Sequence, residues 1–204
     1  MFPVLKNNIA TAISNFTNIP QERRGILDKA ANSIKESVTT LDSFALTFVC
    51  THNSRRSIFG QALAFAAFKQ YNLLGKASSF SAGTESTYLH PNAIASLRRF
   101  GFKVNPEPSN ANPSLEFKIS ESESFQSHST TIEDTTTPNE NFIAIMVCSS
   151  AEQACPFVPG CLKRIPITYE DPKIADNTPE QDKTYDERCM QMATEIFYLI
   201  SNIV

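Results

Sequence analysis

Cys50 and Arg56 are separated by five small or polar residues. The cysteine ends an apolar run, residues 43–50, that is typical of a buried strand, and residues 57–71 have a pattern typical of a helix. Where a parallel strand meets a helix N-terminus, unpaired backbone N–H groups and the helix dipole favour a bound anion. The spacing therefore indicates a cysteine nucleophile beside an oxyanion-binding loop.

The side chains of this loop suit the same chemistry. Arg56 offers a planar fork that matches two oxygens of a tetrahedral oxyanion, and Arg55 adds a second cation beside it. Ser57 can donate a hydrogen bond to a thiolate, and Asn53 suits a left-handed loop position. The alternative, a buried structural Cys50 with Arg56 on the surface, fits this context less well. We predict an oxyanion-binding segment made of Thr51, His52, Asn53, Ser54, Arg55, Arg56 and Ser57.

The stretch "FVCTHNSRRS" resembles the phosphate loop of the low-molecular-weight protein tyrosine phosphatases and of the thioredoxin-coupled arsenate reductases that share their fold. The resemblance continues in "SAGT" at 81–84 and in "YEDP" at 169–172, which matches the Asp-Pro of the family's general acid. It implies that Cys50 attacks the central atom of the oxyanion while Arg56 holds the oxygens. It also implies that Asp171 protonates the departing oxygen, so Asp171 must hold its proton at working pH.

A second cysteine pair lies in "VCSSAEQACPFVPG", where Cys148 ends an expected core strand and Cys155 follows seven residues later. This segment resembles the redox segment of the reductases. The resemblance implies that Cys148 attacks the sulfur of a Cys50–arsenate adduct and releases arsenite. Cys155 then carries the disulfide outward, where thioredoxin reduces it. The alternative, two incidental cysteines, stays open at this point.

Two features favour the reductase over the phosphatase. Thr51 directly after the nucleophile resembles the reductases, and Lys173 and Ile174 stand where the phosphatases usually have aromatic residues. Our first hypothesis is therefore a thioredoxin-coupled arsenate reductase. The alternative is a low-molecular-weight tyrosine phosphatase that hydrolyses phosphate monoesters through a phosphocysteine at Cys50. A second alternative is a non-catalytic oxyanion or redox sensor. His52 departs from both patterns, because a glycine is usual there.

Strand and helix patterns alternate from residue 41 onward and predict an α/β fold. We expect a small, mostly parallel four-stranded sheet with helices on both faces, like that of the low-molecular-weight phosphatases. Residues 1–40 predict two amphipathic helices, an N-terminal extension with stripes at Leu5, Ile9, Ile13 and Phe16 and at Ile26, Ala30, Ile34 and Val38. Residues 41–204 form the α/β domain, with a polar insertion at about 105–140 that partly alternates like a β-hairpin. The expected strands are 43–50, 76–84, 141–150 and 162–169, and the later helices are 90–102 and 178–204.

Composition excludes several function classes. The net charge of −3 and pI of about 5.7 argue against a nucleic-acid partner. The sequence has no apolar run of the ~20 residues needed for a bilayer and no secretory signal pattern, so no membrane association is expected. Five cysteines suggest a cytoplasmic protein with reduced thiols. His90 and His128 lack partners at metal-ligand spacing, so we expect no metal and no cofactor. The expected partners are arsenate, phosphate or a phosphate monoester, with thioredoxin as reductant.

Overall fold

The computed structural model describes residues 1–134, 136–154 and 157–204. A parallel four-stranded sheet in the order β2-β1-β6-β7 confirms the predicted α/β class. Its central strands are buried almost throughout, because layers on both faces exclude water from them. The four strands are β1 (Phe44–Cys50), β2 (Ala77–Gly83), β6 (Phe142–Met146) and β7 (Cys161–Pro166).

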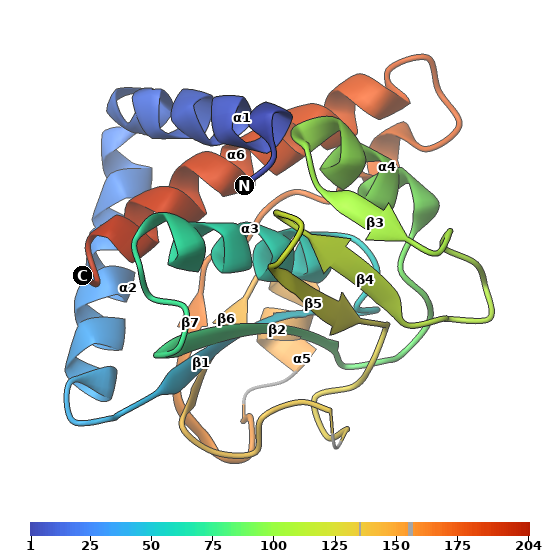
Figure 1. Ribbon diagram of the computed structural model, residues 1–204. Helices are drawn as coiled ribbons and strands as arrows, with labels where there is room; N and C mark the ends of the chain where they lie inside the picture. The colour runs from blue at the N-terminus through green and yellow to red at the C-terminus, as the bar shows by residue number, and fades with distance from the viewer. Residues whose placement is uncertain (135, 155–156) are drawn as a thin grey trace.

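Helices cover both faces of this sheet, as predicted. In Figure 1, α3 (Arg56–Gln70) and α6 (Gln181–Ser201) lie above the sheet and the short α5 (Ser149–Ala154) lies below it. The chain steps from β1 to β2 in one direction and from β6 to β7 in the other. Right-handed crossovers therefore place α3 and α5 on opposite faces. A further helix, α4 (Pro91–Phe100), packs against α6 and ends at Gly101 in the left-handed conformation, at φ 115°.

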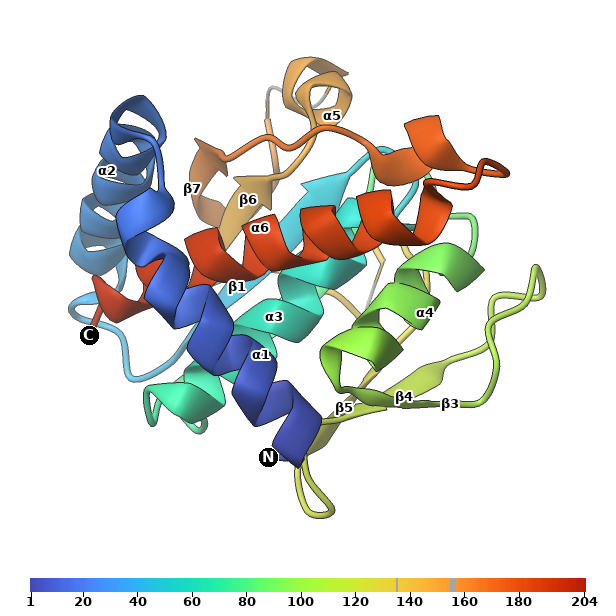
Figure 2. The same cartoon turned by 90° about the horizontal axis from the view of Figure 1, so that it is seen from above.

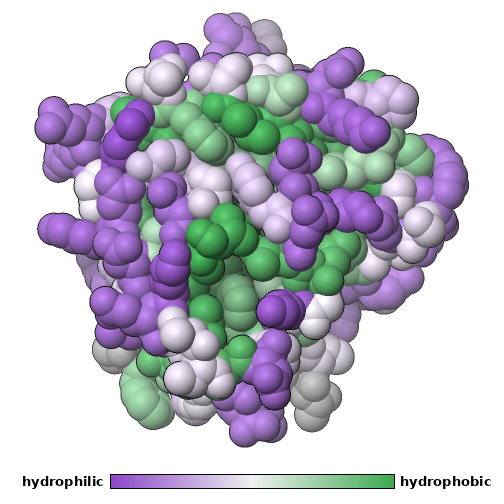
Figure 3. Space-filling view, turned by 60° about the vertical axis from the view of Figure 1, so that its left-hand side comes forward, coloured by the Kyte–Doolittle hydropathy of each residue, from purple (hydrophilic) through white to green (hydrophobic). Residues whose placement is uncertain are grey.

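The N-terminal extension is part of the same packed body. It consists of α1 (Pro3–Ser14), the 3-10 helix η1 (Asn15–Asn18) and α2 (Gln21–Val38). Figure 2 shows α1 lying across α6, and α2 packs against both α6 and the edge strand β7. Ala30 and Ile34 of the predicted α2 stripe are buried, but Leu27 is buried in place of Ile26, which is 40% exposed. Figure 3 looks at the side of α2, where apolar residues line a hollow among polar ones.

The polar insertion contains an antiparallel sheet of three short strands. They are β3 (Lys103–Asn105), β4 (Leu115–Lys118) and β5 (Ser124–Ser127), and β4 and β5 form the hairpin that the alternating sequence predicts. Phe117 is fully buried and stacks on Phe125, which also contacts Phe65 of α3. The insertion is thereby fixed to the helix that follows the oxyanion-binding segment.

The last helix begins later than its sequence suggests. We expected it from residue 178, but α6 starts at Gln181. The Thr178 hydroxyl donates to the carbonyl of Ala175 and closes the 3-10 helix η2 (Pro172–Ala175), so it does not cap α6. None of the helices in the described part of the chain is long and apolar enough to cross a membrane.

A pair of glycines tests how tightly the core is packed. At Gly60 of α3 a Cβ would overlap with the buried ring of Phe48, two residues before Cys50, whereas at Gly25 of α2 it would meet nothing. We expect Gly60→Ala to lower the free energy of unfolding by about 1–3 kcal/mol. Gly25→Ala should raise it by about 0.5–1 kcal/mol, because alanine loses less backbone entropy in a helix. Urea unfolding measures both, and equal effects would contradict the packing described here.

Candidate active site

The loop between β1 and α3 is held from outside through its carbonyl oxygens. The donors are backbone N–H and hydroxyl groups of the segment after β2 and of the insertion. In a trans peptide unit the N–H points away from the preceding carbonyl, so these bonds turn the loop N–H groups inward. A ring of inward N–H groups at a helix N-terminus can bind an anion. The bonds run from Thr84 N to Cys50 O (3.1 Å), from Glu85 N to Thr51 O (2.8 Å), from Thr87 Oγ1 and Ser129 Oγ to His52 O (3.0 Å each), and from His90 N to Ser54 O (3.0 Å).

This close packing requires a glycine at the end of β2. A Cβ on Gly83 would lie 2.7 Å from the carbonyl oxygen of Thr51 and 2.8 Å from the nitrogen of Asn53. Real Cβ atoms do not come so close to backbone atoms. The glycine of "SAGT" therefore lets β2 approach the loop and support it.

Cys50 lies at the bottom of the loop and is 4% exposed. Its Sγ is 3.1 Å from Ser57 Oγ, and Asn53 Nδ2 donates to the same hydroxyl oxygen at 3.1 Å. Because Asn53 occupies a lone pair of that oxygen, the Ser57 hydroxyl hydrogen can be directed at the sulfur. Asn53 adopts φ 45° and accepts from Thr130 N at 3.1 Å, so the expected left-handed position and side-chain tie are both present.

Arg56 and Asp171 are brought together across the sheet edge. Arg56 Nη2 donates to Asp171 Oδ2 at 2.6 Å, and Nη1 donates to the carbonyl of Tyr169 at 2.9 Å. The other oxygen of Asp171 accepts from Lys173 N and caps η2. The predicted guanidinium and the predicted acid are therefore neighbours.

The side chain of Arg55 corrects our prediction of a second cation beside Arg56. Its Nε donates to Tyr185 Oη at 2.7 Å, and Nη2 donates to Asp176 Oδ2 at 2.8 Å. Tyr185 and Asn92 also donate to Asp176. This cluster ties the loop to α4, η2 and α6, and it leaves only the backbone N–H of Arg55 for an anion.

Two more loop side chains point away from the loop centre. The Ser54 hydroxyl donates to the carbonyl of Tyr88 at 2.7 Å. The His52 side chain is 52% exposed, with Nε2 3.6 Å from a carboxylate oxygen of Glu85. Both residues were predicted to bind the oxyanion, and this geometry leaves that task to their backbone N–H groups.

Cys148 lies at the same sheet edge as Cys50. Val49 and Met146 are partners in the β1–β6 ladder, so the cysteines follow neighbouring strands at adjacent levels. Cys148 is 1% exposed, and its Sγ lies 3.6 Å from the Thr51 hydroxyl and 3.3 Å from Ala151 N in the first turn of α5. The predicted third cysteine, Cys155, lies outside the described residues.

A hollow of about 670 Å3 opens above Arg56 and Asp171. Its wall includes Ile174, which is 87% exposed, and the backbone of Tyr169. The Tyr169 side chain is 6% exposed and turned into the core, so it offers no ring face to a ligand. The remaining lining residues are Ser149, Ser150, Thr168 and Glu170.

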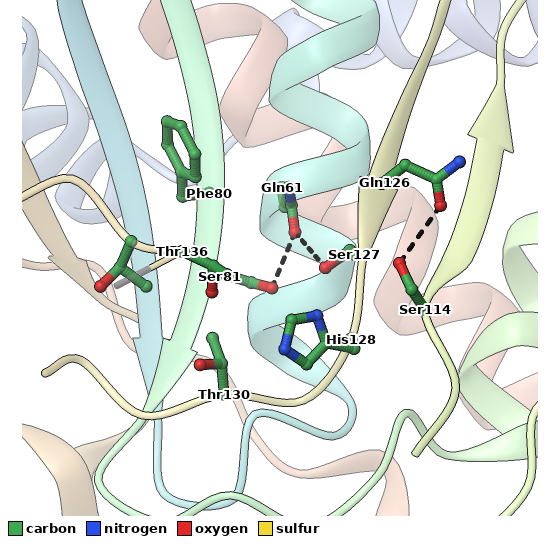
Figure 4. Close-up of a pocket in the computed structure, with 10 residues that line it drawn as sticks. Gln61, Phe80, Ser81, Ser114, Gln126, Ser127, His128, Thr130 and Thr136 are labelled. Carbon is green, nitrogen blue, oxygen red and sulfur yellow. Dashed lines mark hydrogen bonds between the residues drawn. The ribbon is translucent and has the colours of Figure 1, made fainter. Parts of the chain in front are cut away.

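Sequence reasoning missed a polar network behind the loop. Figure 4 shows the Ser81 and Ser127 hydroxyls converging on Oε1 of Gln61, at 2.7 and 2.9 Å, with His128 at the same pocket. Gln61 Nε2 donates to the carbonyl of Ser79, so the amide joins α3, β2 and the insertion. The alternating Ser79 and Ser81 of β2 were the feature of the sequence that could have indicated this network. Among the described residues no cluster of three or more His, Cys, Asp or Glu side chains could hold a metal ion.

The sequence and fold are similar to known enzymes, although no family model matches the sequence. The arsenate reductase of Bacillus subtilis strain 168 is 26% identical over 148 residues, which cover 72% of this chain and 88% of that protein. The arsenate reductase of Brevibacillus brevis is 27% identical over 141 residues, covering 69% and 84%. A low-molecular-weight phosphotyrosine phosphatase from Vibrio cholerae O395 superposes with a TM-score of 0.52 at 11% identity, covering 78% of this chain and 95% of that one, and so shares the fold.

The cluster around Asp176 predicts a pH dependence of stability. Burial raises the pKa of Asp176, but hydrogen bonds from Tyr185 and Asn92 and the charge of Arg55 outweigh it, so the pKa lies below its ordinary value. A carboxylate with a lowered folded-state pKa stabilises the fold above its unfolded pKa of about 3.9 and loses this contribution as the pH falls. Asp176→Asn should therefore be less stable than the wild type at pH 6, with the difference shrinking below about pH 4.

Urea unfolding between pH 3 and pH 7 measures this difference. Exposed Asp42→Asn serves as a matched control, for which we expect a small difference at every pH. A gap between wild type and Asp176→Asn that is constant with pH would contradict the role of this carboxylate.

Proposed function

We propose that the chain belongs to the family in which arsenate reductases and low-molecular-weight protein tyrosine phosphatases share one fold, and that it reduces arsenate to arsenite. The proposal assigns a relay of three thiols to Cys50, Cys148 and Cys155, with thioredoxin as the final reductant. The observation that carries it is the position of the Cys148 sulfur, 3.6 Å from the hydroxyl of Thr51, the residue next to Cys50.

In the first step the Cys50 thiolate attacks arsenic and an As–S bond forms. A hydroxyl group of arsenate leaves with the electron pair of its As–O bond, and the proton of Asp171 converts it to water. Arg56 and the inward N–H groups hold the other oxygens while charge builds up on them. Because Arg56 contacts Asp171 in the free protein, an incoming anion must compete for a guanidinium that already lies beside the acid.

In the second step the Cys148 thiolate attacks the Cys50 sulfur. The new S–S bond displaces the electron pair of the S–As bond onto arsenic, so arsenic(V) leaves as arsenite and two thiols become one disulfide. The N–H of Ala151 donates to the Cys148 sulfur at 3.3 Å and helps to orient it. The pairing of Val49 with Met146, one residue before Cys50 and two before Cys148, supports a placement of both cysteines at one sheet edge.

In the third step Cys155 attacks the Cys148 sulfur and restores the Cys50 thiolate. A Cys148–Cys155 disulfide results, and two electrons from the thioredoxin dithiol reduce it. The role of Cys155 rests on its sequence position seven residues after Cys148 and on the resemblance to the reductases.

The hollow beside Arg56 and Asp171 favours phosphate monoester hydrolysis as a second candidate function. A hollow of about 670 Å3 is much larger than a single tetrahedral oxyanion fills, and it lies in the range of roughly 300–1,000 Å3 that accepts small organic ligands. Cys50, Arg56 and Asp171 would serve the same steps on phosphorus, with water cleaving the phosphocysteine. An exposed Ile174 in place of an aromatic wall favours small esters over phosphotyrosine.

A cysteine series separates these functions. We expect Cys148→Ser to abolish thioredoxin-dependent arsenate reduction and to leave hydrolysis of p-nitrophenyl phosphate within about twofold, because only reduction needs the second thiol. Cys50→Ser should abolish both activities. Cys161→Ser, on β7 and away from the loop, is the matched control and should retain both.

The assays are arsenite release with thioredoxin and its reductase, and p-nitrophenol release without them. Unchanged arsenate turnover in Cys148→Ser would refute the relay. A wild-type protein that hydrolyses the ester but does not reduce arsenate would establish the second candidate. A protein that turns over neither substrate but binds phosphate would be the non-catalytic sensor.

A further inference from the structure

The N-terminal extension reaches the segment that carries Asp171. Arg23 of α2 lies with its guanidinium over the ring of Tyr169, with Cζ 4.8 Å from the ring centroid. Tyr169 is two residues before Asp171 and is 6% exposed. An element outside the family resemblance therefore covers the residue that leads into the acid.

Arg23 is itself fixed by a buried carboxylate of α6. Its Nε and Nη2 both donate to Glu195 Oε2, at 2.8 and 2.6 Å, and the two side chains are 18% and 5% exposed. Gln191 donates to the other carboxylate oxygen of Glu195. A charge-assisted pair with two donors fixes orientation as well as distance, so the guanidinium has one well-defined place.

Tyr169 connects this pair to the catalytic loop. Its N–H donates to the carbonyl of Val147 at 3.1 Å, one residue before Cys148, and its carbonyl accepts from Arg56 Nη1 at 2.9 Å. Burial and the adjacent carboxylate of Glu195 raise the pKa of Tyr169, so its side chain stays neutral against Arg23. One residue thus contacts the extension through its ring and both reactive segments through its backbone.

We propose that Arg23 is a positioning residue, through which the N-terminal extension holds Tyr169 and thereby sets Asp171 and Arg56 in their working geometry. Its catalytic part rests on the proposed function, in which Asp171 protonates the leaving oxygen. Glu170, between the two, is held by Arg188 of α6 but is 89% exposed, and exposed pairs restrain little. The Arg23–Glu195–Tyr169 contact is buried, so solvent weakens this restraint on the segment much less.

A neighbouring arginine provides a matched control. Arg24 of α2 donates to the carbonyl of Phe16 at 2.6 Å and lies over the ring of Tyr198. It fastens the same helix to η1 and α6, but its partners are not in the Asp171 segment. Arg24→Met therefore loosens the extension without touching Tyr169, whereas Arg23→Met removes the proposed restraint.

The kinetic test compares two aryl phosphates. As the S–P bond to Cys50 forms and the P–O bond breaks, the proton of Asp171 passes to the departing phenoxide. Phenyl phosphate has a basic leaving group that needs this proton, and 2,4-dinitrophenyl phosphate does not. We expect Arg23→Met to lower kcat/KM about tenfold for phenyl phosphate, part of the ~10²–10⁴ that general acids contribute, and less than about twofold for the dinitrophenyl ester. Arg23→Lys should recover part of the loss, and Arg24→Met should keep the wild-type ratio.

Amide hydrogen exchange gives a readout that does not depend on activity. Exchange in residues 167–174 should become faster in Arg23→Met, with little change in the core strands. If the unpaired Glu195 carboxylate prevents folding, the Arg23→Met/Glu195→Gln variant removes both charges and takes its place. The proposal is overturned if exchange in this segment is unchanged, or if both esters slow by the same factor. A wild type that hydrolyses neither ester refutes catalysis of ester hydrolysis, and faster exchange confined to 167–174 then still supports the positioning role.

Discussion

The rest of the site depends on the hydrogen bonds that hold the carbonyl oxygens of the β1–α3 loop from outside. A loop of this length can present its N–H groups to one point only if its carbonyls are satisfied elsewhere, because buried backbone oxygens need partners. The segment after β2 and Ser129 of the insertion supply those partners. Gly83 permits the approach, and Asn53 accepts the left-handed turn that closes the loop.

Two adjacent arginines have different tasks because they have different partners. Asp176 and Tyr185 hold the guanidinium of Arg55, whereas Asp171 and the carbonyl of Tyr169 hold that of Arg56. The charge of Arg55 is used to hold the loop rigid, so the loop would keep its shape when an anion binds. The Arg56–Asp171 pair keeps acid and guanidinium together. The Arg55 cluster thus preorganises the backbone of the loop, and the Arg56–Asp171 pair preorganises the two side chains proposed to act on the oxyanion.

Local signals made the centre of the site predictable, and distant contacts decide what was missed. The strand, the Cys-x5-Arg spacing and the helix are contiguous, so the sequence alone indicates Cys50, Arg56 and the sheet that carries them. The direction of Arg55 depends on partners 121 and 130 residues away, which spacing does not reveal. On α2, a shift of one residue between Ile26 and Leu27 leaves the apolar period unchanged, so the buried face is set only by its contact with α6 and β7.

The insertion and the N-terminal extension, which lie outside the family resemblance, contact the segments that hold the site residues in place. They do not supply the proposed reacting groups themselves. The insertion holds the loop through Ser129 and Thr130, and α2 reaches the acid segment through Arg23. A hydrogen bond or buried ion pair holds a catalytic group only as precisely as its own geometry allows. A substitution in a residue that positions such a group therefore changes the alignment of the group and not the type of reaction. Under the proposed function, the rate of this chain and its choice of leaving group would therefore depend on elements outside the family resemblance.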